Sequence, residues 1–230
     1  QVVLDAVASG FNSAGQRCSA LRLLIVQAEI APRLLELLAG YMDELVIGDP
    51  SLLATDVGPV IDREALALLE AHAEKVVAGA RWSHRARLPA ALAGGRFFAP
   101  LAVEIGRIED LEREVFGPII HVVRYEAGRL DDVVDAVNAR GYGLTLGVQT
   151  RIDSLAQRVA KRARVGNVYV NRNMIGAVVG VQPFGGCGLS GTGPKAGGPH
   201  YLHRFATEQT LTINTAAVGG NATLLSLSEQ

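Results

Sequence analysis

The chain has 230 residues, of which 49% are hydrophobic, enough for one large domain or two small ones. Its 22 basic and 23 acidic residues nearly cancel, which argues against a surface dedicated to nucleic acid. No apolar run reaches the ~20 residues that a membrane-spanning helix needs. Two cysteines are too few for a disulfide framework, which favours a reducing compartment and a cytoplasmic location. Because the chain begins with Gln1 inside an amphipathic segment and shows no signal-peptide pattern, we interpret it as a piece of a longer polypeptide.

Apolar spacing in the first part of the chain predicts helices around one buried strand. Gly10 and Gly15 weaken the end of the leading helix. Pro32 suits the first turn of the next helix. In chain order we expect a helix over 1–14, a strand over 21–27, a helix over 32–45, a loop over 46–61 and a helix over 63–78.

Strands and helices then alternate. Gly141 is a natural helix stop, and Thr150 followed by Asp153 resembles a capping pair at a helix start. The expected order is a strand over 97–105, a strand over 119–125, a helix from 130 to 141, a strand over 144–149, a helix from 150 to 164 and a strand over 165–171. This alternation predicts an α/β fold with a mainly parallel sheet flanked by helices.

The sequence changes character after that sheet. Residues 176–199 are dense in Gly and Pro, so we expect a long irregular segment, which in a compact domain is usually functional. The match to Gly-x-Gly-x-x-Gly at 186–191 lacks the flanking strand and helix of a dinucleotide-binding turn, so we reject that interpretation. Residues 205–214 alternate threonine with apolar residues, which predicts a strand at an edge or interface.

Cys18 is the candidate nucleophile. It follows the leading helix on a short loop with small neighbours. A nucleophilic cysteine must be a thiolate, and nearby positive charge lowers a thiol pKa; Arg17 and Arg22 are the candidate sources. The alternative is a small buried hydrophobic residue, the commoner role of a cysteine in isolation.

Three motifs occur in an order that resembles the aldehyde dehydrogenase superfamily. They are Gly15-Gln16-Arg17-Cys18 with Phe11 ahead of it, Glu114-Val115-Phe116-Gly117-Pro118, and Pro183-Phe184-Gly185-Gly186 followed by Ser190-Gly191. The resemblance covers essentially the whole chain. It implies that Cys18 attacks an aldehyde through a thiohemiacetal and a thioester.

The resemblance also implies a nicotinamide cofactor, NAD with NADP as the alternative. It implies that Glu114 binds the nicotinamide ribose and that Phe116 packs beside the ring. Without the motif, Glu114 would be a solvated acid and Phe116 a core residue. In the family, the general-base glutamate, an oxyanion-hole asparagine and most of the dinucleotide-binding domain precede the cysteine. We therefore expect this chain alone to be inactive, and we assign no base to it.

The run 188–199 resembles the L-glutamate γ-semialdehyde (1-pyrroline-5-carboxylate) dehydrogenases, and most of all the bacterial forms fused to a flavin-dependent proline dehydrogenase. FAD would be a cofactor only if such a domain lies upstream. The substrate is also an amino acid, so its carboxylate needs donors, which a glycine-rich loop can present. The expected substrate contacts are Phe11, Ser19, Phe184, Ser190, Gly191 and Thr192.

We divide the chain into a catalytic domain, 1–204, and an oligomerisation strand with a C-terminal tail, 205–230. We expect a homo-oligomer formed through 205–214, and we expect no metal site. Three alternatives stay open: an aldehyde dehydrogenase of another substrate, a cysteine hydrolase with His200 or His203 as base, and a non-catalytic oligomerising fragment.

Overall fold

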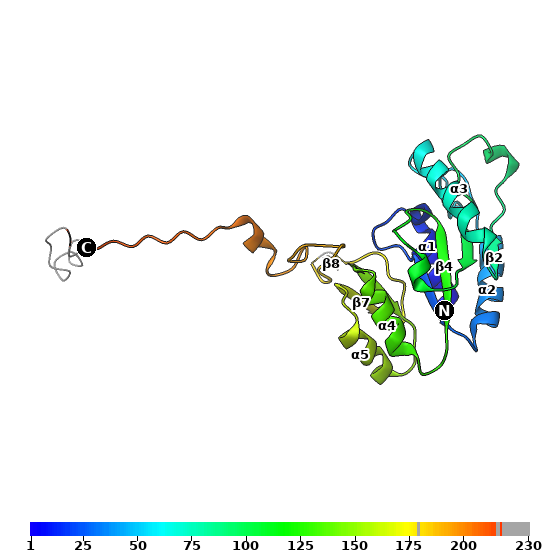
Figure 1. Cartoon of the computed structure of the whole chain (residues 1–230). Helices are drawn as coiled ribbons and strands as arrows, with labels where there is room; N and C mark the ends of the chain where they lie inside the picture. Colours follow the sequence, from blue (N-terminus) through cyan, green and yellow to red (C-terminus); the bar gives the residue numbers. More distant parts are fainter. Residues whose placement is uncertain (179, 215–216, 218–230) are drawn as a thin grey trace. The chain divides into compact units, whose positions relative to one another are not determined.

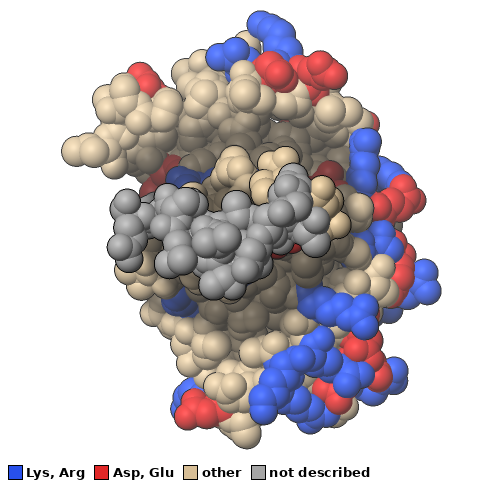
Figure 2. Space-filling view, turned by 90° about the vertical axis from the view of Figure 1, so that its left-hand side faces the viewer, with Lys and Arg blue, Asp and Glu red and all other residues tan. Residues whose placement is uncertain are grey.

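The computed structural model describes residues 1–178, 180–214 and 217. The chain divides into two compact units, Gln1–Gly198 and Pro199–Gln230 (Figure 1). None of the helices among the described residues combines the length and the apolar character that a membrane crossing requires. On the face drawn in Figure 2, basic and acidic side chains lie interspersed along one margin.

A four-stranded, mainly parallel sheet organises the first unit. Its order is β1 (Leu23–Gln27), β4 (Ile119–Tyr125), β3 (Leu101–Glu104) and β2 (Ser83–Arg85). The β1–β4 and β4–β3 pairs are parallel, and β2 closes the edge antiparallel to β3. All of β3 and the first five residues of β4 are buried, which requires cover on both faces because successive side chains alternate. The predicted α/β class with a mainly parallel sheet is confirmed.

Three helices pack on this sheet: α1 (Val2–Phe11), α2 (Ala31–Asp43) and α3 (Arg63–Ala78). α1 contacts β4 and α2, while α2 also contacts β2, and α3 contacts β3. Pro32 lies in the first turn of α2, as expected, and the Asp62 side chain caps α3 by accepting from Ala65 N at 2.7 Å. The apolar face predicted for α2 is buried in the core: Leu34, Leu35, Leu38 and Met42.

A second group of elements in the same unit forms a βαβ crossover with its own small core. β6 (Thr145–Val148) and β7 (Asn167–Val170) are parallel, and α5 (Asp153–Arg162) connects them. α4 (Leu130–Ala139) packs against α5. Two further strands of two residues, β5 (Tyr142–Gly143) and β8 (Cys187–Gly188), pair antiparallel. Short 3-10 turns complete the described elements at Asn12–Gly15, Ala90–Leu92, Ile108–Asp110 and Tyr201–Phe205.

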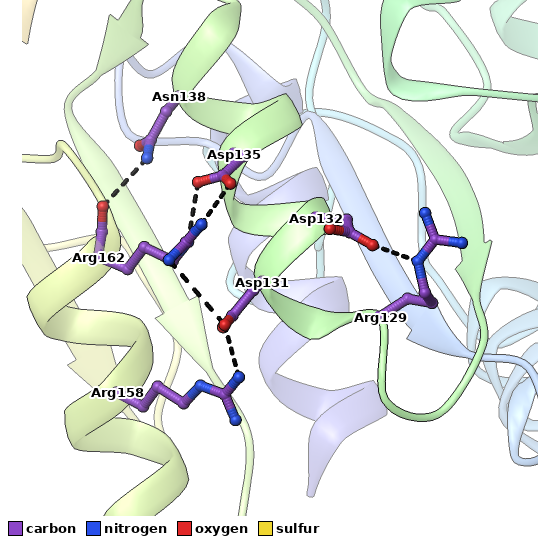
Figure 3. A network of polar contacts seen from close by, with 7 residues as sticks. All are labelled: Arg129, Asp131, Asp132, Asp135, Asn138, Arg158 and Arg162. Atoms are coloured by element: carbon purple, nitrogen blue, oxygen red, sulfur yellow. Dashed lines mark hydrogen bonds and ion pairs between the residues drawn. The ribbon is translucent and has the colours of Figure 1, made fainter.

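Charged side chains connect α4 to α5 (Figure 3). Arg158 and Arg162 of α5 both reach Asp131 of α4, at 2.5 and 3.9 Å, and Arg162 also pairs with Asp135. The Asn138 side chain donates to the carbonyl of Arg162 at 3.0 Å. Arg162 thus lies in the last turn of α5, where a cation favours the helix dipole, and it also faces the acids of α4.

Two local predictions need correction. The strand expected over 97–105 is confined to β3, because Pro100 has no N–H for the ladder. Thr150 does not cap a helix in the expected way. Its hydroxyl accepts from the backbone N–H of Ile152 at 3.1 Å, and α5 begins only at Asp153, without a side-chain cap.

The strand expected over 205–214 does not form within the described residues of the single chain, and its pairing with a partner subunit stays a prediction. A 3-10 turn ends at Phe205, and residues 206–214 have no regular secondary structure and are exposed. A strand is stabilised by hydrogen bonds to a neighbouring strand, and the described residues of this unit form none with which it could pair. The alternating pattern was therefore insufficient by itself. Most of the predicted tail, residues 215, 216 and 218–230, lies outside the described residues.

Candidate active site

The loop after α1 presents Cys18 to solvent. The backbone is left-handed at Ser13, Ala14 and Gly15, with φ of 55°, 52° and 63°. Positive φ is uncommon outside glycine, so three such residues in succession mark a tightly determined turn. Ala14 is buried under this turn, whereas Cys18 is exposed. The alternative in which Cys18 is a small buried hydrophobic residue is therefore wrong.

Gly15 brings the cysteine loop into backbone contact with the second motif. A Cβ at this position would lie 2.1 Å from the carbonyl oxygen of Gly117 and 2.8 Å from that of Gly10. Only glycine fits both this close approach and the positive φ. The neighbouring Gln16 joins the loop to the segment before α3, because its side-chain amide oxygen accepts from Ile61 N at 2.8 Å. The glycine and glutamine of the cysteine motif thus have direct structural roles.

Arg22 lies between the two motifs. Its guanidinium donates to the carbonyls of Gly15, Gly117 and Arg17 at 2.6, 3.2 and 3.0 Å. Burial lowers the pKa of Arg22, while the charges of Glu114 and Cys18 oppose that shift. The sequence suggested Arg22 only as a source of positive charge near the thiol.

The side chains of the second motif are accessible. Phe116 is 44% exposed and its ring centroid lies 4.5 Å from the Arg22 guanidinium, so the alternative of a core residue is wrong. Glu114 Oε1 lies 3.5 Å from Arg22 Nε. Arg140, at the end of α4, donates to the carbonyls of Leu111 and Glu112 at 3.0 and 3.2 Å and holds the segment that leads into Glu114.

A cavity of about 620 Å³ joins these groups to the third motif. Cys18, Arg22, Glu114 and Ser190 all line it, together with residues of β1 and β6. A hydrogen bond from the Thr145 hydroxyl to the carbonyl of Ser19, at 3.4 Å, links β6 to the residue that follows Cys18. The cavity brings the proposed nucleophile, one proposed cofactor contact and one proposed substrate contact to a single surface.

The loop of the third motif is held by its own hydrogen bonds. The Ser190 hydroxyl accepts from Gly143 N at 3.0 Å, and Ser190 N donates to the carbonyl of Cys187 at 3.0 Å. Gly191 N lies 3.5 Å from the carbonyl of Gly188. Two of the backbone N–H groups expected to face a substrate are therefore used within the loop. The glycines of 186–191 allow the loop to fold back on itself. The described residues 192–200 that follow form turns and bends, without the helix of a dinucleotide-binding turn.

The other predicted contacts lie in different environments. Phe11 is 1% exposed and packs in the core, and its expected substrate contact stays a prediction. Ser19 is buried directly beside Cys18. Phe184 is half-buried and pairs with Ala196 through two backbone hydrogen bonds, and Thr192 is exposed. The cavity lining includes none of these four residues.

Asn167 shapes the third motif, a role that the sequence did not indicate. Its buried side chain donates to the carbonyl of Pro183 at 3.0 Å and accepts from Gly185 N at 3.4 Å.

Cys187, interpreted as structural, directs its thiol to the carbonyl of Arg164 at 3.1 Å. Among the described residues, no group of three or more His, Cys, Asp and Glu side chains is arranged to hold a metal ion.

A histidine pair, with His121 fully buried and His72 partly buried, supports the backbone at Arg22, just before β1. His121 Nδ1 and its backbone N–H both lie 2.9 Å from the carbonyl of Arg22. His121 Nε2 lies 2.8 Å from His72 Nε2, so one proton is shared along this contact. Burial lowers the pKa of His121 to about 4, and burial together with Lys75 and Arg113 lowers that of His72. Both imidazoles are neutral at neutral pH.

Comparison with known proteins agrees with this geometry. Residues 1–211 match the model of the aldehyde dehydrogenase family. The chain belongs to that family, which rules against the cysteine-hydrolase alternative. It is 54% identical over 224 residues to the bifunctional protein PutA of Escherichia coli, a match that covers 94% of this chain and 17% of the relative. It is 33% identical over 204 residues to the 1-pyrroline-5-carboxylate dehydrogenase of Geobacillus kaustophilus, covering 85% and 38%.

The fold is also found in solved structures. A crystal structure of a proline utilization A (PutA) mutant from Bradyrhizobium japonicum superposes with a TM-score of 0.87 at 59% identity. That match covers 95% of this chain and 22% of the other. The chain thus spans less than a quarter of the length of the PutA proteins it matches.

Proposed function

We propose that this chain carries the catalytic-cysteine part of a nicotinamide-dependent dehydrogenase that oxidises L-glutamate γ-semialdehyde, the open form of 1-pyrroline-5-carboxylate, to L-glutamate. The observation that carries the proposal is the shared cavity, whose lining includes the exposed Cys18 together with Glu114 and Ser190. The names of relatives from two groups, PutA and 1-pyrroline-5-carboxylate dehydrogenase, support the choice of substrate.

The chemistry assigned to Cys18 is nucleophilic catalysis. Its thiolate adds to the aldehyde carbon, and the carbonyl oxygen becomes the alkoxide of a thiohemiacetal. Loss of hydride from that carbon re-forms the carbonyl and leaves a thioester on the sulfur. Addition of water to the thioester releases the carboxylic acid and returns the thiol. The backbone N–H of Cys18 is the donor that we assign to the alkoxide, because charge develops there.

Glu114 and Phe116 fit a nicotinamide nucleotide. Glu114 keeps part of its carboxylate accessible, which suits the acceptance of hydrogen bonds from ribose hydroxyls, and Phe116 offers an exposed ring face. A nicotinamide cofactor, when bound, accepts the hydride. Because Arg22 already engages Glu114, we do not assign the general base to it, and we expect the base to lie outside this chain.

The substrate carboxylate is assigned to Ser190, which lines the cavity, and to Ser19, Gly191 and Thr192, which lie outside its lining in this chain. The Ser190 hydroxyl accepts from Gly143 N and so keeps its own O–H to donate. Ser19 adds a second hydroxyl next to the nucleophile. Replacing Ser19 by Ala should raise KM for glutamate semialdehyde more than for propanal, which has no carboxylate. Equal changes for both substrates would contradict this anchoring.

The test uses a hybrid in which this chain replaces the region of the Escherichia coli relative that it matches. We expect the hybrid to reduce NAD in the presence of 1-pyrroline-5-carboxylate, Cys18→Ser to abolish this activity and Cys187→Ser to retain it. The 230-residue chain alone should show no comparable rate. A hybrid that folds and binds NAD but has no activity, or activity that survives Cys18→Ser, would refute the proposal.

A further inference from the structure

We propose that Arg22 is a positioning residue. It fixes the cysteine loop against the Glu114–Pro118 segment and so sets the place of Cys18 relative to Glu114 and Phe116. This inference rests on the proposed function of the site, and Arg22 belongs to none of the three motifs described above. Figure 1 shows how far apart these segments lie in the chain: the cysteine loop follows α1, and the second segment precedes β4.

The guanidinium bridges two segments through backbone carbonyls. Nη1 donates to Gly15 and to Gly117, which are 102 positions apart in the sequence, and Nη2 donates to Arg17, the residue before Cys18. A planar group with five N–H donors in fixed directions can hold all of these acceptors at once. A lysine ammonium is a point charge on a flexible stem and cannot reproduce that geometry.

The same side chain contacts both proposed cofactor residues. Its Nε lies 3.5 Å from Glu114 Oε1, and its guanidinium carbon lies 4.5 Å from the centroid of Phe116. The ion pair with Glu114 and the contact with the aromatic face of Phe116 add to the hydrogen bonds, so the Arg22 side chain engages both motif segments. Displacement of Arg22 would therefore release the nucleophile loop and the cofactor contacts together.

Arg22 is itself firmly held. Only 12% of its side chain is exposed, and β1 begins at the next residue. Its carbonyl oxygen accepts from two donors of His121, the backbone N–H and Nδ1, both at 2.9 Å. A buried anchor of this kind keeps a site within the small tolerance that catalysis requires.

The first test measures Cys18 directly in the 230-residue chain. The time course of alkylation by iodoacetamide is followed by mass spectrometry at neutral pH, for Arg22→Ala and Arg22→Lys. We expect Arg22→Ala to slow the alkylation of Cys18 several-fold, because the loop that presents the thiol loses its anchor. Arg22→Lys should show a smaller change, and Cys187 should react at an unchanged rate. Millimolar guanidinium should restore part of the loss in Arg22→Ala, and ammonium should not.

The second test measures turnover in the hybrid. Because a misplacement of about 1 Å can cost roughly 100-fold in rate, Arg22→Lys should lower kcat by at least about tenfold, with a smaller change in KM for the aldehyde. Arg33→Lys is the matched control, because Arg33 is exposed on α2 and pairs with Glu36, away from the two motif segments. Circular dichroism establishes that each variant is folded, and Arg22→Lys decides the question if Arg22→Ala does not fold.

The two proposals fail in different ways. Normal alkylation and normal kcat in folded Arg22→Lys would overturn the positioning role and leave the dehydrogenase function intact. An inactive hybrid with Arg22 present would overturn the proposed function, while the alkylation rates of the isolated chain still decide the role of Arg22. A uniform loss of kcat and stability, without guanidinium rescue or a change in the alkylation rate, would show a purely structural arginine and overturn the inference.

Discussion

Acidification should destabilise this chain through His121, a fully buried imidazole at the centre of the sheet. Its two ring nitrogens contact His72 Nε2 and the carbonyl of Arg22, an arrangement that suits the neutral ring. Burial lowers the folded-state pKa of His121 to about 4, whereas an unfolded histidine titrates near 6.5. Between these values the unfolded chain binds more protons, so its free energy of unfolding falls as the pH falls.

The size of the effect follows from that interval. Each pH unit between about 6.5 and 4 removes at most about 1.4 kcal/mol of stability, or roughly 3 kcal/mol across the whole window. Above about pH 6.5 the contribution is complete. For a domain whose total stability is about 5–15 kcal/mol, this loss would be easy to measure.

The assay is urea unfolding of the 230-residue chain at several pH values, followed by circular dichroism. His121→Gln keeps a donor for the Arg22 carbonyl but cannot titrate, so its stability should decline less steeply between pH 6.5 and 4. His200→Gln is the control, because His200 is exposed, and it should keep the slope of the original chain. Equal slopes in His121→Gln and the original chain would refute the assignment of this pH dependence to the histidine pair.

Three further predictions concern packing and the helix network, each measured by urea unfolding. Gly15→Ala should lower the free energy of unfolding clearly more than Gly128→Ala. Both glycines have positive φ, which destabilises an L residue by about 1–2 kcal/mol, but a Cβ at Gly15 would also lie 2.1 Å from a carbonyl oxygen. Equal losses would contradict the close contact between the two motifs. Leu38→Ala, at a fully buried site of α2, should cost about 2–5 kcal/mol, whereas Leu37→Ala, 41% exposed, should change stability by about 0.5 kcal/mol or less. Arg162→Ala should lower stability at low salt, and added salt should reduce the difference from the original chain, because its partners are exposed acids of α4. A salt-independent difference would contradict an electrostatic role.

Most of the fold could be predicted because its elements bury regular apolar patterns. β4 has the bounds that the sequence predicted, and α3 extends over the predicted residues 63–78. β2 was missed because Ser83, His84 and Arg85 carry no apolar alternation and form a strand only beside the open edge of β3. The segment 205–214 shows the opposite case: its alternating pattern is present, but no strand among the described residues pairs with it, so its pairing with a partner subunit stays a prediction.

The candidate site was only partly predictable. Motif residues at 18, 114 and 190 were identified from local sequence, and the structure places them on one cavity. The role of Arg22 was not predictable, because its acceptors are backbone carbonyls that any sequence provides. The link between Thr145 and Ser19 spans 126 positions and likewise leaves no local pattern. Phe11 belonged to a recognisable motif, yet only the structure showed that it packs in the core.

The central claim is that Cys18 forms a covalent acyl intermediate with the aldehyde. The most direct measurement is mass spectrometry of the hybrid, quenched in acid during turnover with NAD and 1-pyrroline-5-carboxylate and then digested. We predict a glutamyl adduct on the peptide that contains Cys18, absent in Cys18→Ser and unchanged in Cys187→Ser. Turnover with no adduct on Cys18, or an adduct on another residue that persists in Cys18→Ser, would contradict the account.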